Sequence, residues 1–262
     1  MPASVPAPLR ESPLPGAVPR LEVPGWRERF GLAAGVTWRG AGARGFDLGL
    51  ATAEPVGEVM ERWRVFRAAE PGFTAAVLGR QVHGAEVRWH ADPAGWVMLD
   101  GVDGHATDRP GVLLCVTVAD CTPVYLAAPR HGAVALLHAG WRGTAAGVLA
   151  RGIALLHGRT GAAPGDLVAH LGVSICGACY EVGREVLEAF GLPAGGPGPW
   201  RLDVRDQLAR QAQALGVAEV TRSDWCSAHD RDRFYSHRAS RGVDGRMVAY
   251  LGRPVDATGG GR

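Results

Sequence analysis

Two residue types are absent from this sequence, and each absence removes a class of chemistry. The chain has 262 residues and contains neither lysine nor asparagine, so all 28 of its basic residues are arginine. Schiff-base and pyridoxal-phosphate enzymes need a lysine amine, and N-linked glycosylation needs an asparagine. The sequence therefore excludes both, although a bias in coding composition is a sufficient explanation for the missing lysine.

Cysteine is scarce, and long hydrophobic runs are missing. The chain has 5 cysteines, an odd and sparse set that does not form a disulfide framework. No apolar run reaches the roughly 18 residues of a membrane-spanning helix, and the start lacks the basic and then apolar pattern of a signal peptide. We therefore expect a cytoplasmic protein that does not associate with a membrane.

Excess charge is also lacking. The formal net charge is +2, which is too small to indicate a nucleic-acid partner. Hydrophobic residues make up 47% of the chain and charged residues 21%, which is typical of a globular protein with a sizeable core. We expect a monomer or a weak homodimer that acts on a small molecule.

The two ends differ from the middle of the chain. Residues 1–20 are rich in proline and poor in large apolar side chains, which predicts a disordered N-terminal tail. Residues 254–262 predict a flexible C-terminal tail, and residues 21–253 a single domain. The segment 191–200 is rich in glycine and proline, and we interpret it as a surface loop inside that domain.

The middle of the chain alternates strands and helices. Short β-branched runs predict strands, and apolar residues at helical spacing predict helices. The expected strands cover 111–120, 123–128, 132–138 and 167–175, and the expected helices cover 144–158, 180–191 and 202–216. Because strands outnumber helices and several are short, we predict an α/β protein with a mixed sheet covered by helices.

Three segments combine a metal-binding side chain with small residues. His83 precedes a glycine, Cys121 follows Asp120 at the end of a predicted strand, and His138 ends another predicted strand. Two imidazoles and a thiolate are good zinc ligands, and three protein ligands leave the fourth tetrahedral position open for catalysis. On spacing alone, a small buried cysteine and a core histidine are the simpler explanation of these residues.

Other residues point to a binding pocket or to no function at all. Arg142 lies in a glycine-bounded turn before the helix expected near Thr144, where a guanidinium would favour an anion such as phosphate. Tyr235 and Arg238 belong to a short aromatic and cationic stretch that suits the wall of a pocket. Cys176 and Cys179 form a lone C-x-x-C, which we interpret as buried or incidental cysteines because no second such pair exists.

Taken together, these segments resemble one family. The chain is similar to the laccase-domain, or YfiH-type, family, whose members are called polyphenol oxidases, peptidoglycan editing factors and purine nucleoside phosphorylases. The resemblance spans about residues 30–252 and rests on the motifs Gln81-Val82-His83-Gly84, Ala119-Asp120-Cys121-Thr122-Pro123-Val124, His138-Ala139-Gly140-Trp141-Arg142-Gly143-Thr144, Tyr180-Glu181-Val182-Gly183 and Phe234-Tyr235-Ser236-His237-Arg238.

The resemblance implies a fold and a set of site residues. The family fold is a single-domain α/β/β/α sandwich with mixed sheets. Its zinc ligands correspond to His83, Cys121 and His138, and its arginine to Arg142. Asp103 stands where the family has an aspartate, and we expect Asp103 or Asp120 to orient a ligand histidine or to move a proton. Gln81, Arg142, Tyr235 and Arg238 are the expected substrate-binding residues.

The implied activity is that of a zinc-dependent purine nucleoside phosphorylase acting on adenosine, inosine and related nucleosides, with adenosine deaminase activity. Three alternatives stay open. Cys121 and His138 could form a Cys-His amide hydrolase that edits peptidoglycan precursors. The site could instead hold copper in a polyphenol oxidase, although the 9 histidines include no H-x-H pair. A non-enzymatic zinc-stabilised interaction module would need a fourth protein ligand, such as Cys226 or Cys179.

Overall fold

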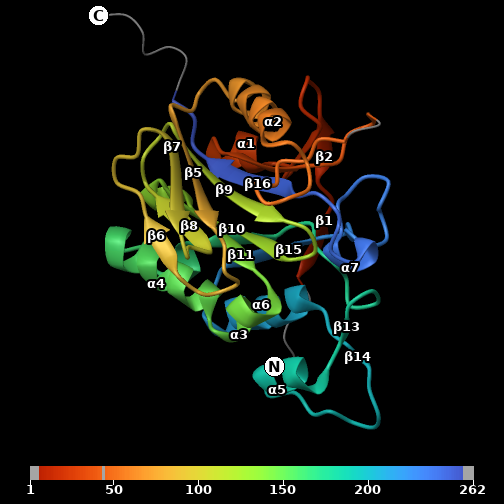
Figure 1. Ribbon diagram of the computed structural model, residues 1–262. Coiled ribbons are helices and arrows are strands. Elements are labelled where there is room, and N and C mark those ends of the chain that lie inside the picture. Colours follow the sequence, from red (N-terminus) through yellow and green to blue (C-terminus); the bar gives the residue numbers. More distant parts are fainter. Residues whose placement is uncertain (1–5, 43–44, 256–262) are drawn as a thin grey trace, which may run out of the picture.

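Two large β-sheets pack face to face, and helices cover their outer faces (Figure 1). The computed structural model describes residues 6–42 and 45–255. Within these residues, the first sheet has the order β1 (Ala7–Leu9), β15 (Glu219–Ser223), β12 (Val168–Leu171), β10 (Thr122–Ala128), β11 (Ala133–Ala139), β8 (Gly104–Thr107) and β6 (Val87–Trp89). The second has the order β2 (Ser12–Leu14), β3 (Arg20–Glu22), β4 (Ala33–Thr37), β16 (Met247–Gly252), β9 (Val112–Val118), β5 (Ala75–Arg80) and β7 (Gly95–Asp100).

Both sheets are mixed. In the first sheet, β12 pairs with β15 in parallel, whereas β10 and β11 form an antiparallel pair. In the second sheet, β5 lies parallel to both β7 and β9, whereas β16 is antiparallel to its two neighbours. The predicted mixed α/β architecture, with helices outside two sheets, is therefore confirmed.

The main core lies between the sheets. Leu114 and Val116 of β9 pack there with Tyr125 of β10 and Leu136 of β11, and all four are fully or almost fully buried. Outside the second sheet, α2 (Val56–Ala68) buries Trp63 and Phe66, whereas α1 (Trp26–Phe30) contacts β4 and buries Trp26 in the core between the sheets. Because successive side chains of a strand point to opposite faces of the sheet, apolar residues of the same strands pack both in the core between the sheets and against the outer helices.

The first sheet has its own helical cover. The predicted helix over 144–158 is two helices, α3 (Trp141–Ala145) and α4 (Val148–Thr160), because Gly147 adopts a left-handed φ of 82° between them. α4 and α6 (Val204–Ala214) pack on this sheet through the residues at helical spacing. A smaller lobe holds β13 (Glu181–Val182), α5 (Arg184–Ala189) and β14 (Trp200–Arg201), and α7 (His237–Ser240) precedes β16.

The expected disordered tail over 1–20 is wrong for the residues that are described there. β1 pairs with β15 and β2 pairs with β3, so this segment joins both sheets at their edges, where prolines need no ladder partner. Between them Glu11 is 2% exposed and accepts hydrogen bonds from Ser223 Oγ at 2.6 Å and His170 Nε2 at 3.0 Å. Residues 1–5, and 256–262 of the expected C-terminal tail, lie outside the described residues.

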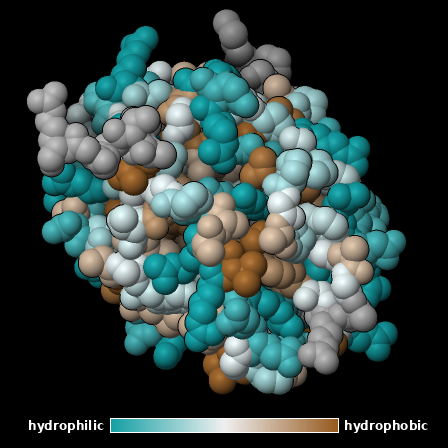
Figure 2. Space-filling view, turned by 90° about the horizontal axis from the view of Figure 1, so that it is seen from above, coloured by the Kyte–Doolittle hydropathy of each residue, from teal (hydrophilic) through white to brown (hydrophobic). Residues whose placement is uncertain are grey.

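The face of the molecule seen from above is mostly hydrophilic. Seen from above, hydrophobic residues gather in a small patch near the centre of a largely polar face (Figure 2). None of the helices in the described part of the chain has both the length and the apolar character of a membrane span.

Candidate metal centre

The three predicted zinc ligands meet where strands from both sheets end. His83 follows β5, Cys121 lies in the turn that carries the chain from β9 in one sheet to β10 in the other, and His138 lies on β11. Their ligand atoms lie within 4.8 Å of one another, and the two imidazole ring centres are 4.9 Å apart. The structure thus brings together residues that are 38 and 17 positions apart in the chain, as the hypothesis requires.

Asp103 holds two of these ligands in place. Its carboxylate accepts a hydrogen bond from His138 Nδ1 at 2.8 Å, which directs His138 Nε2 to the other ligands. The same carboxylate accepts backbone N–H bonds from Val82, His83 and Gly84 at 2.8 to 3.1 Å. Asp103 is fully buried and does not line the cavity described below, so it positions the ligands and does not touch a substrate.

Charge and hydrogen bonding within the group favour the metal-binding state of the thiol. Burial alone would raise the pKa of Cys121, but the charges and hydrogen bonds of His138 and His83 lower its pKa to about 6. Burial alone would lower the pKa of His138, but Cys121 and Asp103 raise its pKa to about 9. The thiolate is therefore available at neutral pH, and a bound cation would replace the proton of His138.

Two glycines leave the space that the ligands occupy. A Cβ added to Gly140 would lie 3.0 Å from Cys121 Sγ and 3.1 Å from His83 Cδ2. A Cβ added to Gly143 would lie 2.5 Å from the Gly84 carbonyl oxygen, so the turn after β11 could not pack against the His83 loop. This cradle, the thiolate with two imidazoles and the supporting carboxylate together fit a divalent ion such as zinc.

The three ligands open onto a large cavity. Its volume is about 1070 Å³, which suits a ligand of nucleoside size together with an anion. Apolar side chains from both sheets and from α2 form part of the wall. Its cationic lining consists of Arg80, Arg142, Arg238 and Arg246, and Asp120 is its one carboxylate among the described residues. The cavity therefore attracts anions.

Arg142 lies in the cavity, as the sequence predicts, but in a different local setting. α3 begins at Trp141 and not near Thr144, so Arg142 is inside the helix and not in the turn before it. Its side chain is exposed, and the guanidinium carbon lies 4.4 Å from the centre of the Trp141 ring. Arg238 also lines the cavity, where it donates to the Glu181 carbonyl at 2.7 Å and covers the Tyr180 ring.

Asp120 lines the cavity, but its carboxylate already has partners. One oxygen accepts from Ser227 Oγ and the other from the Arg238 backbone N–H, each at 2.6 Å. The backbone of Asp120 is in the left-handed region, with a φ of 85°. These bonds tie the Cys121 turn to the loop of Arg238, which makes Asp120 a positioning residue here more readily than a proton carrier.

Two expected substrate contacts differ in the structure. Gln81 lines the cavity, but its amide bonds to the backbone and hydroxyl of Thr117, at 2.7 to 2.9 Å. Tyr235 is 4% exposed, belongs to the core between the sheets and does not line the cavity, so the structure places it apart from the other expected substrate contacts. Arg238 lies on α7 and lines the cavity, whereas Tyr235 lies just before this helix and faces the core.

Sequence reasoning missed several residues. Arg80 and Arg246 line the cavity from strand ends far apart in the chain, and no local pattern marks them. Cys179 and Cys226, suggested above as possible fourth ligands, lie together in a separate group with Cys176 and His229. Neither belongs to the His83 group, so the closed site of the interaction-module alternative is not formed by them.

Comparison with known proteins agrees with this architecture. Over 201 residues the chain is 37% identical to the purine nucleoside phosphorylase YlmD of Geobacillus stearothermophilus, covering 70% of this chain and 73% of that protein. A purine nucleoside phosphorylase of Streptomyces coelicolor is 34% identical over 87% of this chain and 93% of its own length. A protein named adenosine deaminase, from an unknown prokaryotic organism, is 35% identical over 53% of this chain and 58% of its own length.

Solved structures give the same result. The crystal structure of YlmD from Geobacillus stearothermophilus superposes with a TM-score of 0.83 at 31% identity, over 94% of this chain and all of that one. A model of the family described as multi-copper polyphenol oxidoreductase laccase matches residues 33–254. The family resemblance noted in the sequence is thereby confirmed, and the chain belongs to the multi-copper polyphenol oxidoreductase laccase family.

Proposed function

We propose that this protein is a zinc-dependent purine nucleoside phosphorylase that also deaminates adenosine. The observation that carries the proposal is the position of the His83, Cys121 and His138 group on the wall of an arginine-lined cavity. Relatives that share the fold are named as purine nucleoside phosphorylases, and one is named as an adenosine deaminase.

The charge of the cavity supports phosphate as a co-substrate. In phosphorolysis a phosphate oxygen bonds to C1′ of the ribose, the glycosidic bond breaks, and the purine leaves with a proton. Arg142 is exposed in the cavity, where its guanidinium lies over the Trp141 ring and is not paired with a carboxylate of the described residues, so it can bind phosphate oxygens. Arg238 already donates a hydrogen bond to a carbonyl, and it would add positive charge to the cavity wall beside the bound phosphate.

The metal site supplies the other half of the chemistry. A bound divalent ion would provide a Lewis acid with an open coordination position at the end of the cavity. His83, Cys121 and His138 would hold it, and Asp103 would keep His138 in the correct tautomer through the 2.8 Å bond. Two imidazoles and a thiolate suit both zinc and copper, and we favour zinc because neither reaction transfers electrons.

A product assay tests the proposal. Purified protein with measured zinc content is incubated with inosine and phosphate, and hypoxanthine and ribose 1-phosphate are quantified by chromatography. Adenosine without phosphate is the second substrate, with inosine and ammonia as products. We expect both sets of products, and their loss in His83→Ala. Absence of products from zinc-loaded protein would overturn the proposal.

One observation favours a second candidate, a cysteine amide hydrolase. His138 lies between the Cys121 thiol and the Asp103 carboxylate, which is the order of a nucleophile, a base and the group that orients the base. Iodoacetamide labelling of Cys121, read by peptide mass spectrometry, separates the two functions. Protection of the thiol by zinc supports the phosphorylase, and rapid labelling in zinc-loaded protein supports the hydrolase.

A further inference from the structure

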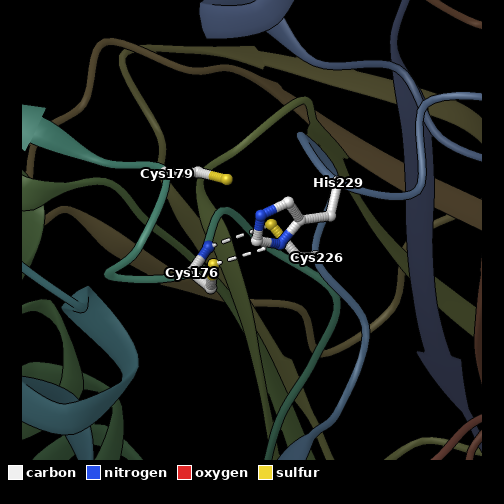
Figure 3. A group of neighbouring side chains, drawn as sticks. All are labelled: Cys176, Cys179, Cys226 and His229. Atoms are coloured by element: carbon white, nitrogen blue, oxygen red, sulfur yellow. Dashed lines mark hydrogen bonds between the residues drawn. The ribbon is translucent and has the colours of Figure 1, made fainter.

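Four side chains with metal-binding chemistry converge away from the cavity site. Cys176 and Cys179 lie in the segment between β12 and β13, and Cys226 and His229 lie in the segment after β15 (Figure 3). Their ligand atoms all lie within 4.8 Å of one another. Cys226 is buried, Cys176 and Cys179 are half-buried, and His229 is exposed. The described residues thus contain a second group of ligands that the proposed function does not use.

The spacing of these residues forms a pair of motifs. Cys176 and Cys179 are a C-x-x-C, and Cys226 and His229 are a C-x-x-H, which is the two-loop pattern of a structural zinc site. In the first loop the backbone N–H groups of Cys179 and Tyr180 both donate to the Cys176 carbonyl at 3.0 Å, which closes a tight turn. In the second loop the Asp230 N–H donates to the Cys226 carbonyl at 2.9 Å.

The distances within the group match one ion shared by all four side chains. Cys176 Sγ lies 3.6 Å from His229 Nδ1. A tetrahedral zinc ion, with bonds of about 2.3 Å to sulfur and about 2.0 Å to nitrogen, separates these two ligand atoms by about 3.5 Å. The two loops therefore hold Cys176 Sγ and His229 Nδ1 at the separation that a shared zinc ion requires.

Backbone N–H groups hydrogen-bond to the buried sulfur of Cys226 and offset part of the burial that raises the pKa of its thiol. The Cys176 N–H donates to Cys226 Sγ at 3.3 Å, and the backbone N–H groups of Ala228 and His229 also bond to this sulfur. Hydrogen bonds of this kind stabilise a thiolate, which is the form that binds metal. These bonds come from both loops and hold the sulfur beside the ligand atoms of Cys176, Cys179 and His229.

We propose that Cys176, Cys179, Cys226 and His229 bind a structural zinc ion. Three thiols release their protons to the solvent as the ion binds, and neutral His229 supplies the fourth bond. Thiolate ligands select zinc over magnesium or calcium. Four protein ligands leave no open position, so this site does no chemistry on a substrate, unlike the three-ligand site at the cavity.

The position of this ion gives it a role in shaping the cavity. The two loops lie side by side through a bridge between Ser174 and Cys226. From the first loop, the Ile175 N–H donates to the Asp120 carbonyl at 3.1 Å, and from the second, Ser227 Oγ donates to the Asp120 carboxylate at 2.6 Å. Ile175 and Tyr180 line the cavity. The ion would therefore fix the loops that support the Cys121 turn.

Metal counting tests the proposal independently of any activity. The full chain is loaded with zinc under reducing conditions and desalted, and bound zinc is measured by mass spectrometry of the metal. We expect two zinc ions per chain in the wild type, corresponding to the two ligand groups. The double variant His83→Ala/His138→Ala should retain one ion and Cys176→Ser/Cys226→Ser should retain one, whereas Cys115→Ala, which removes a cysteine outside both groups, should retain two.

Cobalt identifies the ligands of the second ion. In the His83→Ala/His138→Ala background one equivalent of Co²⁺ should give the strong visible bands and the charge-transfer absorption of tetrahedral thiolate coordination. His229→Ala should alter this spectrum and release the metal to a chelator at least tenfold faster, and exposed His157→Ala should change neither. Because His229 is exposed, its removal spares the core should the cysteine variants not fold.

Two results would overturn the proposal. One is a zinc content that is the same in Cys176→Ser/Cys226→Ser and in the wild type. The other is an intact mass lower by two hydrogens, with peptides that map a disulfide among Cys176, Cys179 and Cys226, in protein purified without added oxidant. A different result separates the two proposals. If the wild type binds one zinc ion, and Cys176→Ser/Cys226→Ser removes it while His83→Ala/His138→Ala does not, the proposed function is contradicted and this site is supported.

Discussion

Asp103 Oδ1 lies 2.8 Å from His138 Nδ1, and the same carboxylate receives the backbone N–H groups of Val82, His83 and Gly84. One buried side chain therefore sets the orientation of one metal ligand and the backbone position of another. The Asp103 carboxylate lies just before β8, bonds to His138 on β11 of the first sheet and also holds the loop after β5 of the second, so the packing of the sandwich and the shape of the metal site depend on the same group.

Asp103→Asn should weaken zinc binding and leave the fold intact. An amide cannot accept from His138 and from three backbone N–H groups at once, so the ring of His138 loses its fixed tautomer. Loss of such a partner typically costs about 10- to 100-fold in metal affinity. Competition against a chromogenic chelator measures the change, and Asp92→Asn, on an exposed loop, is the control. Equal zinc affinity in Asp103→Asn and the wild type would contradict the role given to Asp103.

Gly140→Ala should also weaken the first metal site, for a steric reason. The added Cβ would lie 3.0 Å from Cys121 Sγ and 3.1 Å from a carbon of the His83 ring, so the two ligands must move apart. The matched control is Gly158→Ala in α4, where the new Cβ meets nothing within 4 Å and should stabilise the helix by up to about 1 kcal/mol. Zinc affinity measures the effect on the metal site, and thermal unfolding measures the effect on stability. Unchanged zinc affinity in Gly140→Ala would contradict the proposed role of Gly140 in leaving space for the ligands.

Arg142→Gln should separate the two proposed activities. Loss of a charge-assisted contact to phosphate costs about 1.5–3 kcal/mol, so the KM for phosphate in phosphorolysis should rise about tenfold or more. Deamination of adenosine uses no phosphate and should change far less. Arg130→Gln, whose side chain is 86% exposed, serves as the control. Parallel losses in both reactions would show that Arg142 does not act on phosphate.

The buried pair His90 and His105 should make stability fall in weak acid. Burial lowers the pKa of His90 from 6.5 to about 4, with a further contribution from Arg88. Burial, with the charge of His90, lowers the pKa of His105 from 6.5 to about 3. Both rings stay neutral in the folded protein, while the unfolded chain takes up protons below pH 6.5. Their contribution to the free energy of unfolding is therefore complete above pH 6.5 and is lost as the pH falls toward 4 and 3.

Replacement of one ring tests this linkage. His90→Gln keeps a hydrogen-bonding group beside His105 Nδ1, which His90 Nε2 contacts at 3.0 Å. The fall in unfolding free energy from pH 7 to pH 5 should be smaller in this variant by up to about 2 kcal/mol. Urea unfolding at each pH measures it, with His157→Gln as an exposed control. An identical fall in His90→Gln and the wild type would contradict the assignment.

The sequence alone predicts much of the fold and the first metal site. β9, β10 and β11 appear close to their predicted bounds because short β-branched runs mark buried strands. The family motifs predict the ligands His83, Cys121 and His138, whereas their distances in the chain follow no metal-binding spacing. Arg80 and Arg246 of the cavity wall could not be predicted, since they come together with Arg142 and Arg238 only after both sheets have packed.

Other errors have physical causes that local sequence does not reveal. Proline content predicts disorder for 1–20, yet β1 and β2 need pairing on one side only at the sheet edges. Tyr235 and Arg238 are close in sequence but face the core and the cavity respectively. The C-x-x-C of Cys176 alone does not predict a metal site, because the matching C-x-x-H of Cys226 lies about fifty residues later in the chain.

Diffraction at the zinc absorption edge, from crystals grown with inosine and phosphate, tests the central claim most directly. The account predicts an anomalous peak bound by His83, Cys121 and His138 with one position free of protein atoms, and phosphate beside Arg142 in the same cavity. A peak at these ligands that is closed by a fourth protein side chain, or no peak there in crystals of zinc-loaded protein, would contradict it.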